Sequence, residues 1–80
     1  MQEAEIYSRL AKIFRDTFDE DVALKPSTTA QDVDGWDSFA HINLILTVER
    51  EFAIKFTTSD VERMRSVGDL ATFIGQHASN

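Results

Sequence analysis

The chain has 80 residues and a mass of 9.1 kDa, the size of one small domain with a single hydrophobic core. Its hydrophobic (42%) and charged (28%) fractions are typical of a folded domain rather than of a disordered or membrane-inserted chain. The net charge of −6 disfavours binding to nucleic acids, and the absence of cysteine excludes disulfides, thiolate metal sites and a cysteine nucleophile. We interpret residues 1–80 as one domain, and the start of the chain, which lacks an export signal, predicts a cytoplasmic protein.

Helical spacing of apolar residues marks the first element. Its stripe consists of Ile6, Leu10, Ile13, Phe14 and Phe18. The acidic run after Phe18 places like charges at the negative end of the helix dipole, so we expect the helix to end there. A long loop containing Pro26 and a Ser-Thr-Thr cluster follows, and Val22, Leu24 and Val33 are expected to anchor this loop to the core.

A second helix is expected to begin at Asp37 or Ser38, because both residue types are favourable at a helix start, and to end at Phe52. With about 100° between successive residues, the side chains sort onto two faces. The inward face holds His41, Leu44, Ile45, Val48 and Phe52, with Ile42 at its edge. The outward strip holds Phe39, Asn43, Leu46 and Arg50.

Two further helices are expected after residue 57. The third opens at Thr58 or Ser59, where the segment from Ser59 to Glu62 has the spacing of a capping box. The fourth opens at Ser66 and frays near Gly75. Its buried residues are expected to be Val67, Leu70, Phe73 and Ile74. No segment alternates with a period of two, so the prediction is an all-α fold, a small four-helix bundle of three longer helices and one short helix with a long loop between helices one and two.

The charge is unevenly distributed along the chain. Seven of its acidic residues but only one basic residue, Lys25, lie between residues 16 and 37, immediately before Ser38. Such a segment is either a solvated acidic loop or a surface that steers a basic partner toward Ser38. The two interpretations stay open at this point.

Catalysis and metal binding are disfavoured. Ser38, His41 and Asp37 suggest a triad, but His41 lies on the inward face, Asp37 is suited to capping, and no glycine-rich turn offers an oxyanion site. Asp32, Asp34 and Asp37 do not form a calcium loop, because the sixth position counted from Asp32 is Asp37 rather than glycine. We therefore expect no enzyme and no metal site. Ser38 remains, as a helix cap or as a hydroxyl presented for modification at a helix N-terminus that tolerates phosphate.

The segment Gly35-Trp36-Asp37-Ser38-Phe39, followed by an apolar helix that ends Glu-Arg-Glu-Phe, resembles the acyl carrier protein family. Asp37-Ser38-Phe39 is similar to the Asp-Ser-Leu signature of that family, and the resemblance extends over essentially the whole chain. It implies a covalent 4′-phosphopantetheine on Ser38, derived from coenzyme A by a phosphopantetheinyl transferase that recognises Asp37. Acyl-loading and acyl-transferring enzymes would exchange acyl or aminoacyl thioesters with this arm, and such a carrier is expected to be monomeric.

The resemblance implies two further sets of residues. Partner enzymes are expected to contact Phe39, Asn43, Leu46, Glu49, Arg50, Asp60 and Glu62. An apolar acyl chain is expected to be sheltered by Phe14, Ile45, Val48, Met64 and Ile74, whose alternative role is core packing alone.

The second helix departs from the strongly acidic helix of the members that serve fatty-acid synthesis. Ala40, His41, Asn43 and Arg50 occupy its corresponding positions. Together with Trp36, this departure favours a specialised pathway (polyketide, nonribosomal peptide or related) over housekeeping fatty-acid synthesis. Trp36 has an alternative role as a hydrophobic plug that pins the loop against the start of this helix. The alternative function is a small helical protein-interaction domain in which Ser38 is only a helix cap.

Overall fold

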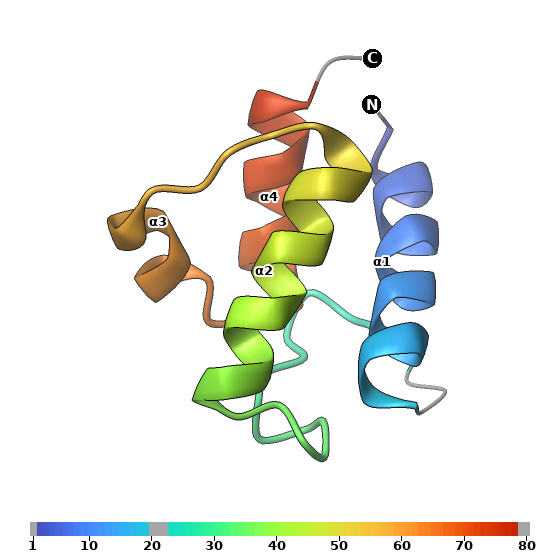
Figure 1. Ribbon diagram of the computed structural model, residues 1–80. Helices are drawn as coiled ribbons and strands as arrows, with labels where there is room; N and C mark the ends of the chain where they lie inside the picture. Colours follow the sequence, from blue (N-terminus) through green and yellow to red (C-terminus); the bar gives the residue numbers. More distant parts are fainter. Residues whose placement is uncertain (1, 20–22, 79–80) are drawn as a thin grey trace.

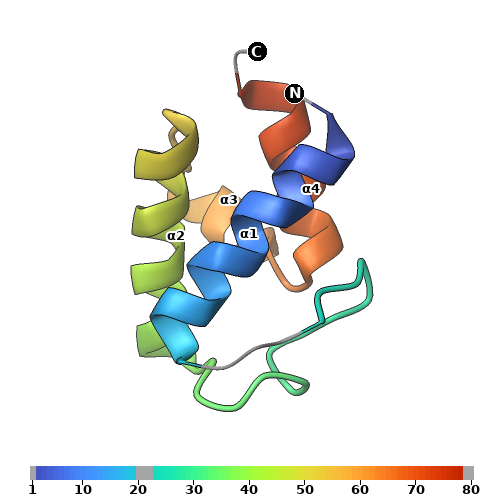
Figure 2. The same cartoon turned by 90° about the vertical axis from the view of Figure 1, so that its right-hand side faces the viewer.

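The computed structural model describes residues 2–19 and 23–78, and over these residues the chain folds into four helices (Figure 1). They are α1 (Glu3–Phe18), α2 (Ser38–Phe52), α3 (Thr58–Arg63) and α4 (Val67–His77). Helix α1 runs antiparallel to α2 and α4, and the short α3 lies beside α2 on the side away from α1 (Figures 1 and 2). The described residues contain no strand, only one isolated bridge between Thr29 and Ser66. The all-α prediction is confirmed.

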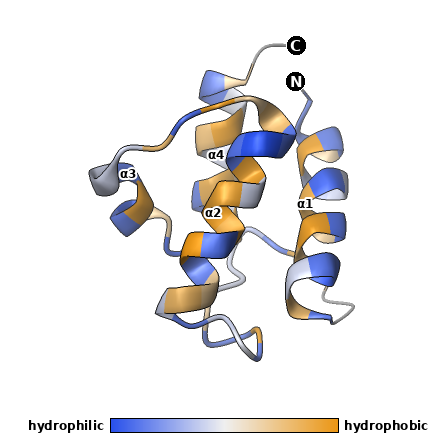
Figure 3. Ribbon diagram, viewed as in Figure 1, coloured by the Kyte–Doolittle hydropathy of each residue, from blue (hydrophilic) through white to orange (hydrophobic). Residues whose placement is uncertain are grey.

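The three longer helices bury their apolar faces against one another. The side chains with no solvent exposure come from all three, and they are Leu10, Leu44, Val48, Val67, Leu70 and Ile74. Helix α1 is hydrophobic toward the other helices and hydrophilic on its outer side, whereas α2 is hydrophobic over much of its middle (Figure 3). Burial of apolar area is the main stabilising term in a domain of this size. Helix α3 contributes no fully buried residue of its own.

The ends of α1 and α2 lie where the sequence predicts them. Each helix is followed by a residue in the left-handed conformation, Asp19 (φ 54°) after α1 and Ala53 (φ 55°) after α2. The Asp19 N–H donates to the carbonyl of Arg15, and the Ala53 N–H donates to that of Glu49, which closes the last turn of each helix.

Two sequence expectations about the shorter helices are wrong in detail. The capping box of α3 is formed by Thr57 and Asp60, two residues before the expected pair of Ser59 and Glu62. Helix α4 continues past Gly75 to His77, because the carbonyl of Ile74 still accepts a backbone hydrogen bond from Ala78.

The loop before α2 is fastened to the start of α4. The Gly68 N–H donates to the Pro26 carbonyl (3.0 Å) and the Val67 N–H donates to the Thr28 carbonyl (2.8 Å). Val33 is buried as expected and Leu24 is half-buried, whereas Val22 lies outside the described residues. The loop therefore crosses the end of the bundle at which α2 and α4 begin (Figure 2).

Candidate functional site

The start of α2 divides two roles between neighbouring residues. Asp37 is the N-cap, and its carboxylate accepts a hydrogen bond from the Ala40 N–H at 2.8 Å. Ser38 is the first helical residue and is exposed to solvent. Because Asp37 caps the helix, the hydroxyl of Ser38 is not needed for that purpose.

A tight turn sets the direction from which the chain enters α2. Gly35 has a φ of +88°, a conformation that glycine adopts at no steric cost. The next residue, Trp36, is only 6% exposed, and its ring meets Phe14 edge-on at a centroid distance of 5.2 Å. Phe18 packs against the same indole at 6.1 Å. The indole therefore pins the loop to α1. It also stacks on His41 in the first turn of α2 at 6.0 Å, the contact with the helix start that the plug interpretation of Trp36 predicts.

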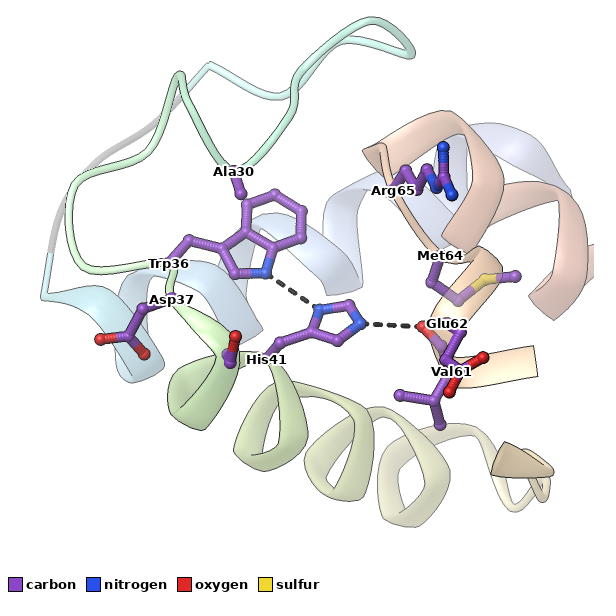
Figure 4. Close-up of a pocket in the computed structure, with 9 residues that line it drawn as sticks. Ala30, Trp36, Asp37, His41, Val61, Glu62, Met64 and Arg65 are labelled. Carbon is purple, nitrogen blue, oxygen red and sulfur yellow. Dashed lines mark hydrogen bonds between the residues drawn. The ribbon is translucent and has the colours of Figure 1, made fainter. Parts of the chain in front are cut away.

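The indole of Trp36 also belongs to a chain of hydrogen bonds (Figure 4). Its Nε1–H donates to Nδ1 of His41 at 3.0 Å, and Nε2 of His41 lies 3.1 Å from the carbonyl oxygen of Val61 in α3. Since Nδ1 accepts, the proton of the neutral imidazole is on Nε2, which donates to Val61. His41 thus joins the loop, α2 and α3.

An open cleft of about 440 Å³ lies beside Ser38, between the loop, the start of α2 and α3. It is lined by Ala30, Trp36, Asp37, Ser38, His41, Val61, Glu62, Met64 and Arg65. Its walls are apolar at Trp36, Val61 and Met64, whereas exposed Glu62 and Arg65 make part of the lining charged. The cleft therefore offers an apolar surface next to the exposed serine.

The residues expected to contact partner enzymes fall into two groups in the structure. Phe39 (78% exposed), Leu46 (50%), Asn43 and Arg50 project into solvent along α2. Ile42, which the sequence places at the edge of the buried face, is 57% exposed and belongs with them. We call these five residues the outer strip of α2.

Two of the three acidic members of that expected set, Glu49 and Asp60, have hydrogen-bond partners in the structure. The Glu49 carboxylate accepts the N–H of Phe56 at 2.7 Å and so fastens the segment leading to α3. The carboxylate of Asp60 accepts the Thr57 N–H at 3.0 Å, and this backbone hydrogen bond is the main reason that the pKa of Asp60 lies below its ordinary value of 3.8. Glu62 is exposed at the cleft beside Ser38.

The five residues expected to shelter an acyl chain are all buried, but only Met64 lines the cleft beside Ser38. Phe14, Val48 and Ile74 belong to the close-packed core. Ile45 lines a separate cleft of about 190 Å³ farther along α2. The structure thus places these residues around the bundle interior rather than around one preformed cavity.

The two side chains that the sequence suggests as triad partners of Ser38 are both engaged in other hydrogen bonds. Both ring nitrogens of His41 are engaged with Trp36 and Val61, and the Asp37 carboxylate is engaged in capping. In the described ranges no three His, Cys, Asp or Glu side chains gather as metal ligands would. None of the four helices is both long and apolar enough to cross a membrane, taking residues 2–19 and 23–78 together.

Residues 8–74 match the family described as phosphopantetheine attachment site. The fold is similar to that of the holo acyl carrier protein from Geobacter metallireducens, with 38% sequence identity, a TM-score of 0.80, and coverage of 86% of this chain and 80% of that chain. It is also similar to the acyl carrier protein from Thermotoga maritima (22% identity, TM-score 0.82, coverage 95% and 89%), a likeness of fold alone.

Proposed function

Because this chain belongs to the acyl carrier protein family, whose members carry acyl groups on a covalent phosphopantetheine, we propose that Ser38 is the residue to which the phosphopantetheine is attached. The observation that carries the proposal is the position of Ser38, exposed at the first position of α2 beside an open cleft, with capping left to Asp37. When bound, the group supplies the thiol for thioester formation, and a chain without cysteine has no other source of one.

The residues around Ser38 fit the product of that attachment. Its oxygen would form the ester bond to phosphorus while coenzyme A loses its adenosine bisphosphate portion and the hydroxyl loses its proton. The resulting phosphodiester is an anion, and the N-terminal end of α2 stabilises negative charge through its dipole and its unpaired N–H groups. Since His41 is fully engaged, the base that removes the proton is expected to come from the transferase.

The direct test is the intact mass of the protein after incubation with coenzyme A and a broad-specificity phosphopantetheinyl transferase. We expect a gain of one phosphopantetheine that is lost in Ser38→Ala. Ser59→Ala is a matched control, because Ser59 is also an exposed serine in the first turn of a helix. A gain that persists in Ser38→Ala, or no gain with several transferases, would contradict the assignment.

We propose that the outer strip of α2 is read by the partner enzymes. It combines the large exposed apolar side chains of Phe39, Ile42 and Leu46 with the cationic Arg50. A basic enzyme surface would meet few acidic side chains on this strip. This surface favours enzymes of a specialised pathway over those of fatty-acid synthesis. Exposed apolar residues cluster at protein–protein contacts because their burial stabilises the complex.

Arg50→Glu tests that surface. We expect altered rates with the transferase or the loading enzyme and little change in melting temperature, because Arg50 is exposed. Lys12→Glu, an exposed charge reversal on α1, is the control. Unchanged rates for Arg50→Glu would remove the outer strip from partner recognition. If an enzyme of fatty-acid synthesis loaded this protein as efficiently as it loads its own carrier protein, the assignment to a specialised pathway would be contradicted.

A further inference from the structure

Two neighbouring clefts lie between α2 and α3. The larger, of about 440 Å³, lies beside Ser38. The smaller, of about 190 Å³, is lined by Ile42, Ile45, Leu46, Glu49, Phe56, Thr57, Thr58 and Val61, about one helical turn farther along α2. Val61 lines both clefts. Ser38 lines the first cleft but not the second, which lies beyond Val61.

The hydrogen bond between His41 and Val61 lies at the edge of the first cleft, at the residue that both clefts share. It joins α2 to α3 at 3.1 Å, and the opposite ring nitrogen of His41 accepts the indole N–H of Trp36 at 3.0 Å (Figure 4). An acyl chain that runs from Ser38 between these helices must displace the imidazole. Displacement leaves the indole N–H and the Val61 carbonyl without their partners in a part-buried place, which is unfavourable.

The alternative route, behind the indole, is filled. Trp36 is buried, and its ring packs edge-on against Phe14, which is 1% exposed. The next inward residues of α2, Leu44 and Ile45, are 0% and 3% exposed. Close-packed interiors admit additional methylene groups only by displacing side chains.

We propose that His41 is a specificity-determining residue: held between Trp36 and Val61, it closes the bundle interior and confines the cargo on Ser38 to short acyl groups, including polar ones. This inference rests on the proposed attachment at Ser38. A short acyl group contacts the apolar wall formed by Trp36 and Met64 and leaves its polar atoms toward solvent near Glu62 and Arg65. The tail of a long apolar chain would stay in water, where its exposure is unfavourable.

The test compares thioesters of different length on the intact protein. The wild type, His41→Ala and Trp36→Phe are each loaded by the phosphopantetheinyl transferase with butyryl- or octanoyl-coenzyme A. Loading is verified by intact mass. For each protein we measure the rate at which hydroxylamine cleaves the thioester, and we divide the rate for the octanoyl form by the rate for the butyryl form. His77→Ala, which alters the other histidine of the chain at the end of α4, is the control.

We expect a ratio near one for the wild type and for His77→Ala. In His41→Ala the octanoyl chain should enter the interior, and the ratio should fall roughly tenfold, the effect of burying about two methylene groups. The methyl signals of Ile45 should shift on octanoyl loading in this variant only. Trp36→Phe, which keeps an aromatic ring but removes the N–H, should lower the ratio to a smaller extent. This variant provides the test if circular dichroism shows that His41→Ala is not folded.

Three results would overturn the inference. Protection of the octanoyl thioester in the wild type, with shifted Ile45 methyl signals, would show that the interior is already open to long chains. A ratio near one in both folded variants would show that His41 does not control entry. Failure of every protein to load would remove the proposed attachment at Ser38 and this inference with it, whereas the first two results leave the attachment intact.

Discussion

Separate replacements of Asp37 and Ser38 by alanine should have different effects, one on the stability of α2 and the other on the attachment of phosphopantetheine. The Asp37 carboxylate accepts the Ala40 N–H at 2.8 Å, whereas the neighbouring Ser38 is an exposed first helical residue. Asp37→Ala should therefore destabilise the fold. Ser38→Ala should leave the fold intact and abolish the gain of phosphopantetheine.

The size of each effect follows from helix energetics. Loss of an aspartate N-cap costs about 1 kcal/mol, and loss of its charge at the positive end of the dipole costs roughly another 0.5 kcal/mol. For a domain of this length a loss of about 1.5 kcal/mol lowers the melting temperature by roughly 6–12 °C. Ser38→Ala replaces an exposed serine by a better helix former, so its stability should stay within about 0.5 kcal/mol of the wild type.

Thermal denaturation of the unmodified proteins, followed by circular dichroism, measures both effects, and intact mass measures modification. If Ser38→Ala lowers the melting temperature as much as Asp37→Ala does, the serine caps the helix and the division of roles derived from the structure is refuted. If both variants keep the wild-type melting temperature, the cap at Asp37 contributes nothing measurable.

Two further predictions concern the framework around the site. Gly68→Ala would place a Cβ 2.8 Å from the Pro26 carbonyl oxygen and should destabilise the protein by about 1–3 kcal/mol. In the control Gly75→Ala the nearest atom lies 3.7 Å from the new Cβ, and this variant should gain about 0.5–1 kcal/mol of stability. Thermal denaturation measures both effects, and equal melting temperatures for the two variants would contradict the packing at the start of α4. The pKa of Asp60 is lowered in the folded state mainly by the Thr57 N–H, so its stabilising effect is complete above the ordinary value of 3.8 and is lost as the pH falls through the lower folded value. Asp60→Asn should therefore lower the melting temperature near neutral pH, and this difference should shrink as the pH falls below 3.8. A difference independent of pH would show that the charge of Asp60 is not involved.

The longer helices could be predicted because their apolar stripes and their ends point to the same boundaries. For α3 the sequence is ambiguous, since both Thr57 to Asp60 and Ser59 to Glu62 have capping-box spacing. The hydrogen bond from the Phe56 N–H to Glu49, a residue of another helix, holds the chain just before the first of these pairs. A contact between two elements of this kind is not visible in a local pattern.

The site shows the same limit. The sequence singles out Ser38 and Asp37 as candidates through a local motif, and helical angles correctly place Phe39 and Leu46 on the outer side of α2. It assigns His41 to the buried face and Trp36 to a plug, but it does not reveal that the two side chains bond to each other. That contact depends on the turn at Gly35, whose positive φ brings the indole over the first turn of α2.

The position of Trp36 gives the protein an optical reporter of its own. It is the only tryptophan of the chain, its indole is buried, and its N–H is hydrogen-bonded to an imidazole one turn from Ser38. Indole fluorescence responds to the polarity of its surroundings and to hydrogen bonding at the ring nitrogen. Attachment of a group at Ser38, occupation of the adjacent cleft, or displacement of α3 by an enzyme can therefore be followed by emission from the unlabelled protein, in real time and at low concentration.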